Sequence, residues 1–205
     1  MLTTDTFASR LRAATIAHHS AAETSGFMSG LLDGTLASTD YAHLVSQLQL
    51  VYAALDHVSS QHRDDPTYGP FFDPRLDRTR ALAADTATLG AAPVATATRT
   101  YADRIDAVAA DPLLVLAHHY TRYMGDLSGG QAISAVLART MGLSAHEGLA
   151  FYQFDLGPLP RYKNAYRERL DDLHLTDDDE RRFIGEVLTA YTLNSAVFTE
   201  LDQRS

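Results

Sequence analysis

Apolar residues recur along the whole chain at the spacing of an amphipathic helix, and no segment alternates as a half-buried strand does. The chain is therefore predicted to be all-α, with loops at about 64–77 and 144–160, where proline and glycine gather. We expect a single domain spanning residues 1–205. It should contain roughly eight helical pieces, over about 5–23, 27–32, 80–89, 95–109, 112–141, 160–173 and 177–201, and a longer one that follows 38–40 and carries Leu44, Leu48, Val51 and Leu55.

Several residues indicate where these helices begin or break. Residues 38–40, Ser-Thr-Asp, are typical of an N-cap before a longer helix, and Thr176 has the same role before the last helix. Gly26 and Gly30 are expected to break up the short second piece. Pro112 suits the first position of a helix, where its missing N–H is not needed.

Composition and charge narrow the classes of function. The 205 residues are 45% apolar, which predicts a folded globule, and the absence of cysteine excludes disulfides and thiolate chemistry. The formal net charge of −9 argues against nucleic-acid binding, which needs a basic surface. No apolar run is long enough for a membrane anchor, and the first residues lack a secretion signal. A cytoplasmic protein is expected.

Three glycines fall within six residues of the helix predicted over 112–141 and are expected to interrupt it, at Gly125, Gly129 and Gly130. Each costs roughly 0.5–1 kcal/mol relative to alanine in a helix, so the cluster needs a reason. Gly125 and Gly129 share a face of bare backbone, which suits either a close helix crossing or the approach of a flat ligand. The letters LSGGQ also occur in transport ATPases, but Lys163 is followed by Asn164, and the required phosphate loop is absent.

Two adjacent histidines in the first helix are candidates for a metal ligand. Glu23 lies one turn after His19 and can accept the proton of its second ring nitrogen, as ligand histidines require. His18 has Ala22 at the equivalent position, so His19 is the better candidate. A surface histidine is the alternative interpretation.

Charged residues form two further patterns. Lys163, the only lysine, shares a helix face with Arg167, and such a pair can bind carboxylates, although a solvated basic face explains it equally well. Arg122 and Asp126 are four residues apart and can form an ion pair that orients the carboxylate. An ordinary surface pair is the alternative.

Two segments resemble the heme oxygenase family. Residues 120–131, YTRYMGDLSGGQ, are similar to its distal helix, and residues 11–28 to its proximal helix, with His19 in register. The resemblance runs from about residue 11 to residue 201. It implies the heme oxygenase fold, with heme between the two helices. His19 would then ligate the iron, Gly125 and Gly129 would lie against the ring, and Asp126 would hold a network of distal water.

The resemblance also assigns residues around these central ones. It implies that Arg12, Lys163 and Arg167 bind the heme propionates, that Tyr120 borders the heme edge, and that Glu23 and Ser128 belong to the heme-binding set. The polar residues of the distal network would be Arg122, Tyr52, Tyr101 and Asn194, and the pocket wall would include Phe151, Tyr191 and Phe198. Ile16 departs from the family, which often has a lysine there.

The chemistry implied by the resemblance uses heme b as both substrate and cofactor. With O2 and electrons from NADPH through a reductase or a ferredoxin, the ring opens to biliverdin, CO and ferrous iron. His118 and His119 are not expected to bind the iron, because a second axial ligand would block O2. A heme carrier or sensor that does not degrade heme is the alternative. A di-iron bundle is disfavoured, since its paired Glu-x-x-His motifs are missing.

Overall fold

Each segment with helical spacing forms a helix in the computed structural model, which describes residues 6–204 without the side chain of Glu23. The α-helices are α1 Phe7–Glu23, α2 Gly26–Asp33, α3 Ser38–Gln61, α4 Thr79–Leu89, α5 Thr96–Ala107, α6 Pro112–His119, α7 Gly125–Met141, α8 Leu159–Asp171 and α9 Asp177–Asp202. Short 3-10 turns lie at Gly69–Phe71, Pro74–Leu76 and Ala150–Tyr152. Residues 6–204 contain no β-sheet, and the all-α prediction is confirmed. Asp5, where the first helix was predicted to start, lies outside the described residues.

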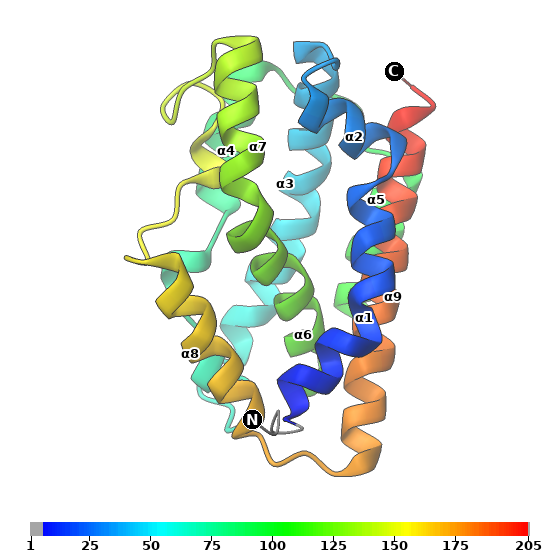
Figure 1. The fold of residues 1–205 in the computed structure, drawn as a ribbon, viewed down its shortest axis with the longest axis vertical. Helices are drawn as coiled ribbons and strands as arrows, with labels where there is room; N and C mark the ends of the chain where they lie inside the picture. The colour runs from blue at the N-terminus through cyan, green and yellow to red at the C-terminus, as the bar shows by residue number, and fades with distance from the viewer. Residues whose placement is uncertain (1–5, 205) are drawn as a thin grey trace, which may run out of the picture.

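The long helices α3 and α9 form the frame of the molecule, and α6 packs against both of them. α1 lies along α9, while α4 and α5 cover α3 (Figure 1). Leu11 of α1, Leu55 of α3, Leu116 of α6 and Phe183 of α9 are fully buried in one apolar core. This packing brings the first helix beside the last. Within residues 6–204, no helix combines the length and apolar character needed to cross a bilayer.

The segment predicted as one glycine-interrupted helix over 112–141 is interrupted at another place. α6 and α7 run on from one another through a single π-helical turn, Tyr120–Met124, and α7 continues unbroken past Gly129 and Gly130 (Figure 1). The prediction that the glycines break the helix was therefore wrong. A π turn shifts the helical register locally, and such turns often occur at functional sites. It also explains why the described residues form nine α-helices instead of eight.

Two other predicted boundaries differ from the structure. α2 includes Gly26 and Gly30, because the side chain of Ser25 caps its start and Gly34, with φ of +70°, ends it. An N-cap within 38–40 implies that the helix starts at residue 39 or later, but α3 starts at Ser38. Ala37 occupies the cap position, and its backbone N–H donates to Asp40 Oδ2 at 2.9 Å. Asp40 thus stabilises the helix from its third position.

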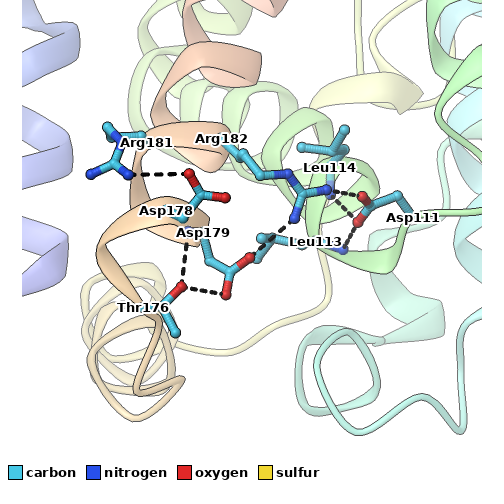
Figure 2. Close-up of polar contacts among 8 residues, drawn as sticks. All are labelled: Asp111, Leu113, Leu114, Thr176, Asp178, Asp179, Arg181 and Arg182. Carbon is cyan, nitrogen blue, oxygen red and sulfur yellow. Dashed lines mark hydrogen bonds and ion pairs between the residues drawn. The ribbon is translucent and has the colours of Figure 1, made fainter.

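Charged caps tie the start of α6 to the start of α9 (Figure 2). Thr176 Oγ1 accepts from the backbone N–H of Asp179 at 3.2 Å, which confirms Thr176 as the cap of α9. Asp111 accepts from two backbone N–H groups at the start of α6, at 3.1 and 3.3 Å. Arg182 binds both Asp111 and Asp179. The same contacts therefore stabilise two helix ends and join them.

The Thr176→Ala variant tests this cap. It should lower the free energy of unfolding by about 1 kcal/mol, because one N-terminal N–H loses its acceptor. For a chain of this size the melting temperature should fall by about 2–4 °C, measured by circular dichroism. Thr189→Ala is the matched control, since the Thr189 hydroxyl is exposed and bonds only to Gly185 O of its own helix at 2.9 Å. Equal losses in both variants would contradict the assignment.

Candidate active site

A cavity of about 270 Å³ opens between α1, α2, α3, α7 and α9, and we call it the inner cavity. Its wall is mostly apolar, and the polar groups on it are few. The residues that line it include His19, Met28, Leu44, Leu48, Gly125, Asp126, Gly129, Ile133, Phe151, Tyr191, Asn194 and Phe198. A mostly apolar cleft with a few convergent polar groups is typical of a small-molecule site.

A second hollow of about 590 Å³ adjoins the inner cavity toward the surface, and we call it the rim. The two share His19, Gly125 and Tyr191, so they form one continuous cleft between α1 and α7. The rim is more polar and is lined by Arg12, Tyr120, Ser128 and Arg167, among others. The cleft therefore has an apolar inner end and a cationic outer end.

Gly125 and Gly129 present bare backbone to this cleft. A Cβ atom built on either residue would meet no atom within 4 Å, so neither glycine serves a close helix crossing. Gly130 differs, because its Cβ would lie 3.0 Å from the ring of Tyr152. Two of the three glycines thus leave space for a ligand, while the third makes room for a packed side chain.

His19 lies on the opposite wall, on α1. Its side chain is partly buried and lines both hollows, whereas His18 is exposed. The His19 ring meets the ring of Tyr191 of α9 edge to face, with centroids 6.0 Å apart. The structure therefore places His19 and not His18 in the cleft. The predicted contact from Glu23 lies outside the described residues, which do not include that side chain.

Asp126 is held by a hydrogen-bonded group behind the cavity wall. The hydroxyl of Tyr52 donates to Asp126 Oδ2. The hydroxyl oxygen of Tyr52 in turn accepts from Arg122 Nε at 3.2 Å, and Arg122 Nη2 lies 3.8 Å from Asp126 Oδ1. Arg122 Nη1 also donates to Asn194 Oδ1 at 2.5 Å. The predicted Arg122–Asp126 ion pair is present, and α3, α7 and α9 together orient the carboxylate.

The surroundings of Asp126 favour the protonated carboxyl group over the carboxylate more than bulk water would. Burial raises the pKa of the Asp126 carboxyl, and Arg122 and the hydrogen bond from Tyr52 oppose that effect. Burial also disfavours the Arg122 cation, but Tyr52 and Asp126 together raise the pKa of Arg122. The side chain of Asp126 is 13% exposed, and it reaches the inner cavity. It is therefore placed to exchange a proton with a molecule in the cavity, directly or through water.

Three cations gather at the rim. Lys163 Nζ donates to Ser128 Oγ at 3.3 Å, and burial, with Arg167 nearby, lowers the pKa of Lys163. Arg12 and Arg167 both act on Tyr120, whose pKa is raised by burial and lowered by these two charges. Within residues 6–204, none of the three cations forms an ion pair with a carboxylate. An anionic group can therefore bind at this end of the cleft.

Comparison with known proteins identifies a family that this sequence matches. The sequence profile of heme oxygenase covers residues 5–200. The chain belongs to the heme oxygenase family. Heme oxygenase 1 of the cyanobacterium Synechocystis sp. is 35% identical over 204 residues, which is 95% of this chain and 84% of the relative. The heme oxygenase of Guillardia theta is 33% identical over 201 residues, 94% of this chain and 85% of the relative.

Solved structures agree with the family assignment. The crystal structure of Synechocystis heme oxygenase-1 in complex with heme superposes with a TM-score of 0.91 at 34% identity, covering 97% of this chain and 93% of that one. The heme oxygenase of Leptospira interrogans gives a TM-score of 0.89 at 30% identity, covering 95% and 99%. The family and the fold expected from the sequence are confirmed, and so is the expectation of a heme oxygenase enzyme.

His118 and His119, at the end of α6, have hydrogen-bond partners outside the cleft. His118 Nε2 lies 2.8 Å from Glu186 Oε1, and His119 Nδ1 lies 2.9 Å from the hydroxyl oxygen of Tyr166. Neither lines the inner cavity or the rim. Burial lowers the pKa of His119 to about 3, so that ring stays neutral. Both histidines therefore bind protein partners and are absent from the lining of the cleft.

Some residues that line the inner cavity were not predicted from the sequence to line a site. They come mainly from α2 and α3 and line the inner end of the cavity, namely Met28, Leu31, Leu44 and Leu48, with Ile133 and Tyr152 from the distal side. Leu44 and Leu48 were predicted only as apolar positions of a long helix. Cavity lining and packed core share one hydrophobic pattern, so the sequence offers no signal that separates them.

Proposed function

We propose that this chain degrades heme oxidatively, to biliverdin, CO and ferrous iron, with O2 and electrons from NADPH through a reductase or a ferredoxin. The observation that carries the proposal is the opposition of His19 to the bare backbone of Gly125 and Gly129, with Asp126 at the same cavity. A Synechocystis relative of similar fold was crystallised in complex with heme. The family assignment supports the proposal that heme binds in this cleft.

The residues present fit heme chemically. The ring needs a flat apolar slot, and the unobstructed face of Gly125 and Gly129 supplies one wall of it. The iron needs an imidazole, and His19 is the histidine that lines the slot in the described part of the chain. The propionates need cations, and Arg12, together with Lys163 and Arg167 of α8, supplies them at the rim. Heme, when bound, supplies the iron that activates O2 and the ring that is oxidised.

His19 would hold the iron from the α1 side. A neutral imidazole donates less electron density than a thiolate does, which disfavours O–O cleavage of the kind used by P450 enzymes. The edge-to-face contact with Tyr191, at 6.0 Å between ring centroids, restrains the His19 ring. His19 would therefore help to fix the position of heme in the cleft.

The rim cations would set the orientation of heme within the slot. Arg12 approaches from α1, and Lys163 and Arg167 approach from α8, so the propionate edge is held from two sides. Ile16 also lines the rim and is 53% exposed, so α1 contributes a single cation where the family often has two. We infer that α8 contributes most of the propionate binding in this chain.

Asp126 would control protons on the distal side. Gly125 and Gly129 present no side chain to the cleft, so their backbone would confine a small molecule that binds on this side of it. The Asp126 carboxylate, oriented by Tyr52 and Arg122, can hold water beside it and deliver a proton through that water. Delivery through water avoids a strong acid in direct contact, which would favour O–O cleavage over ring attack.

Hemin titration followed by reduction in air tests the proposal. The purified protein should take up one hemin with saturation, and added ascorbate or a reductase should then abolish the Soret band as biliverdin forms. A saturable complex whose Soret band persists under these conditions identifies a heme carrier or sensor instead. An absence of saturable uptake contradicts heme binding altogether.

The Gly129→Ala variant separates the folding role of this glycine from its binding role. A methyl group meets no protein atom there, so the heme-free protein should become more stable, by up to about 1 kcal/mol, because alanine favours a helix over glycine. The same methyl group should weaken hemin uptake, since it occupies the ring face. Chemical unfolding and hemin titration measure the two effects. Gly185→Ala is the control, since its Cβ is equally unobstructed but lies outside the cleft.

A further inference from the structure

Two large apolar side chains are exposed among the described residues, and both lie at the cleft. Ile16 of α1 is 53% exposed and lines the rim, and Leu32 of α2 is 37% exposed and lines the inner cavity. Single exposed apolar residues are ordinary on a protein surface and need no explanation. Two that line one cleft differ from these, because a molecule bound in that cleft removes both of them from water.

The α1 wall of the rim carries no charge between Arg12 and His19. Residues 13–22, AATIAHHSAA, contain no lysine, arginine, aspartate or glutamate, although 21% of the whole chain is charged. Thr15 also lines the rim, but its hydroxyl donates to Leu11 O of its own helix at 2.9 Å. A carboxylate that reaches this part of the wall therefore finds no cation there.

Ile16 lies on α1 between the two groups that would hold heme. It follows Arg12 by four residues and precedes His19 by three, and such spacings place side chains on one face of a helix. Along the helix axis these spacings are about 6 and about 4.5 Å. Arg12, Ile16 and His19 all line the rim. A molecule that binds both Arg12 and His19 must therefore pass over Ile16.

The three rim cations form one group. Burial raises the pKa of Tyr120, and Arg167 and Arg12 both oppose that effect, so both charges lie near this hydroxyl. Burial and the neighbouring Arg167 charge lower the pKa of Lys163. The group can bind a carboxylate from three sides, but a carboxylate placed beside Ile16 has no cation of its own.

We propose that Ile16 determines substrate specificity, by covering the porphyrin between His19 and the propionates and by making one free propionate sufficient for binding. The proposal rests on the proposed function, which places heme in this cleft. Contact with the ring removes the exposed half of Ile16 from water, which favours binding. The same side chain cannot pair with a carboxylate. The accepted substrates therefore include iron porphyrins in which one propionate is esterified.

Methyl NMR with gallium(III) protoporphyrin IX tests whether a porphyrin covers Ile16. This probe has the ring and the carboxylates of hemin but does not activate O2, so no turnover interferes. The chain has four isoleucines, Ile16, Ile105, Ile133 and Ile184. The δ1 methyl of Ile16 should shift upfield, because the ring current shields atoms above a porphyrin face, and that of Ile133 should shift because it lines the inner cavity. Ile105, which is 0% exposed and lines neither hollow, is the internal control.

The two methyl signals separate this inference from the proposed function. An Ile16→Val variant lacks the δ1 methyl and identifies its signal. A shifted Ile133 signal with an unshifted Ile16 signal would show that the porphyrin binds without covering Ile16. That result overturns the inference and leaves heme binding intact. If neither signal shifts and the probe shows no saturable uptake, heme binding itself is contradicted and the inference fails with it.

Ile16→Lys tests the specificity. Fluorescence titration gives the affinities of gallium(III) protoporphyrin IX and of its monomethyl ester, and in the wild type the two should agree within about threefold. In Ile16→Lys the free acid gains an ion pair that the ester lacks, so the ratio should grow by a further two- to fivefold, about the effect of one exposed ion pair. Ala14→Lys is the matched control. It adds the same charge at an exposed position of α1 that lines neither hollow, and should keep the wild-type ratio. Equal ratios in Ile16→Lys and the wild type, or a larger wild-type loss, would overturn the proposal.

Ile16→Ala measures the apolar contact alone. It should weaken uptake of gallium(III) protoporphyrin IX by about three- to tenfold, because the porphyrin no longer buries half of an isoleucine side chain. The ratio between acid and ester should stay at the wild-type value, since alanine also lacks a charge. Both variants at this position should fold, because Ile16 is exposed and alanine and lysine favour a helix, and circular dichroism checks this. An unchanged affinity in Ile16→Ala would contradict the contact.

Discussion

His19→Ala should abolish the ferric heme spectrum characteristic of an imidazole ligand and reduce biliverdin formation by more than about 100-fold. Loss of the hydrogen-bond partner of a metal ligand already costs about 10–100-fold, so loss of the ligand itself should exceed that. His19 lines both parts of the cleft, and no other histidine in the described part of the chain does so. Absorbance and electron paramagnetic resonance spectra of the hemin complex measure the first effect, and product yield measures the second.

His18→Ala is the matched control, because it removes an adjacent imidazole from the same helix. His18 is exposed and does not line the cleft, so this variant should keep the spectrum and the yield of the wild type. Imidazole added to His19→Ala should restore the spectrum if the variant has lost only the ligand. An unchanged spectrum in His19→Ala, with an altered one in His18→Ala, would transfer the ligand role to His18.

The helices were predictable because their signal is local. Apolar spacing in the predicted helix after 38–40 and in the one over 177–201 indicates one buried face, and that face exists whichever helix covers it. The π turn at Tyr120–Met124 has no such signal. Arg122 and Tyr123 within it are buried against partners far along the chain, Tyr52 and Asp56. Tertiary contacts therefore stabilise the π turn. The glycines that follow it do not interrupt the helix.

The contacts of the candidate site also fall into two groups, those that the sequence could predict and those that it could not. Spacing within one helix was enough to select His19 over His18 and to pair Arg122 with Asp126. The contact between Tyr52 and Asp126 joins residues 74 positions apart, and only the family resemblance pointed to it. Nothing in the sequence pointed to the pairing of His118 with Glu186, 68 positions apart. Partners across a fold depend on helix packing, which periodicity alone does not determine.

Asp126→Asn should leave hemin uptake intact and reduce biliverdin formation by about 100-fold or more, the usual contribution of a positioned proton donor or acceptor. Asparagine can still accept from the Tyr52 hydroxyl, so the variant removes the exchangeable proton while keeping the shape of the network. Asp126→Ala is a poorer test, because it also removes the oxygen that accepts from the Tyr52 hydroxyl and so leaves both Tyr52 and the buried Arg122 without this partner.

The Asp126→Asn result is decisive only if uptake and turnover are measured on the same preparation. Hemin titration should give an affinity close to that of the wild type, since His19 and the rim cations are unchanged. Reduction in air should then leave most of the Soret band in place. Asp103→Asn, an exposed position on α5, controls for loss of one negative charge and should turn over normally. A normal biliverdin yield from Asp126→Asn would show that the proton reaches the distal side by a route that does not involve this carboxylate.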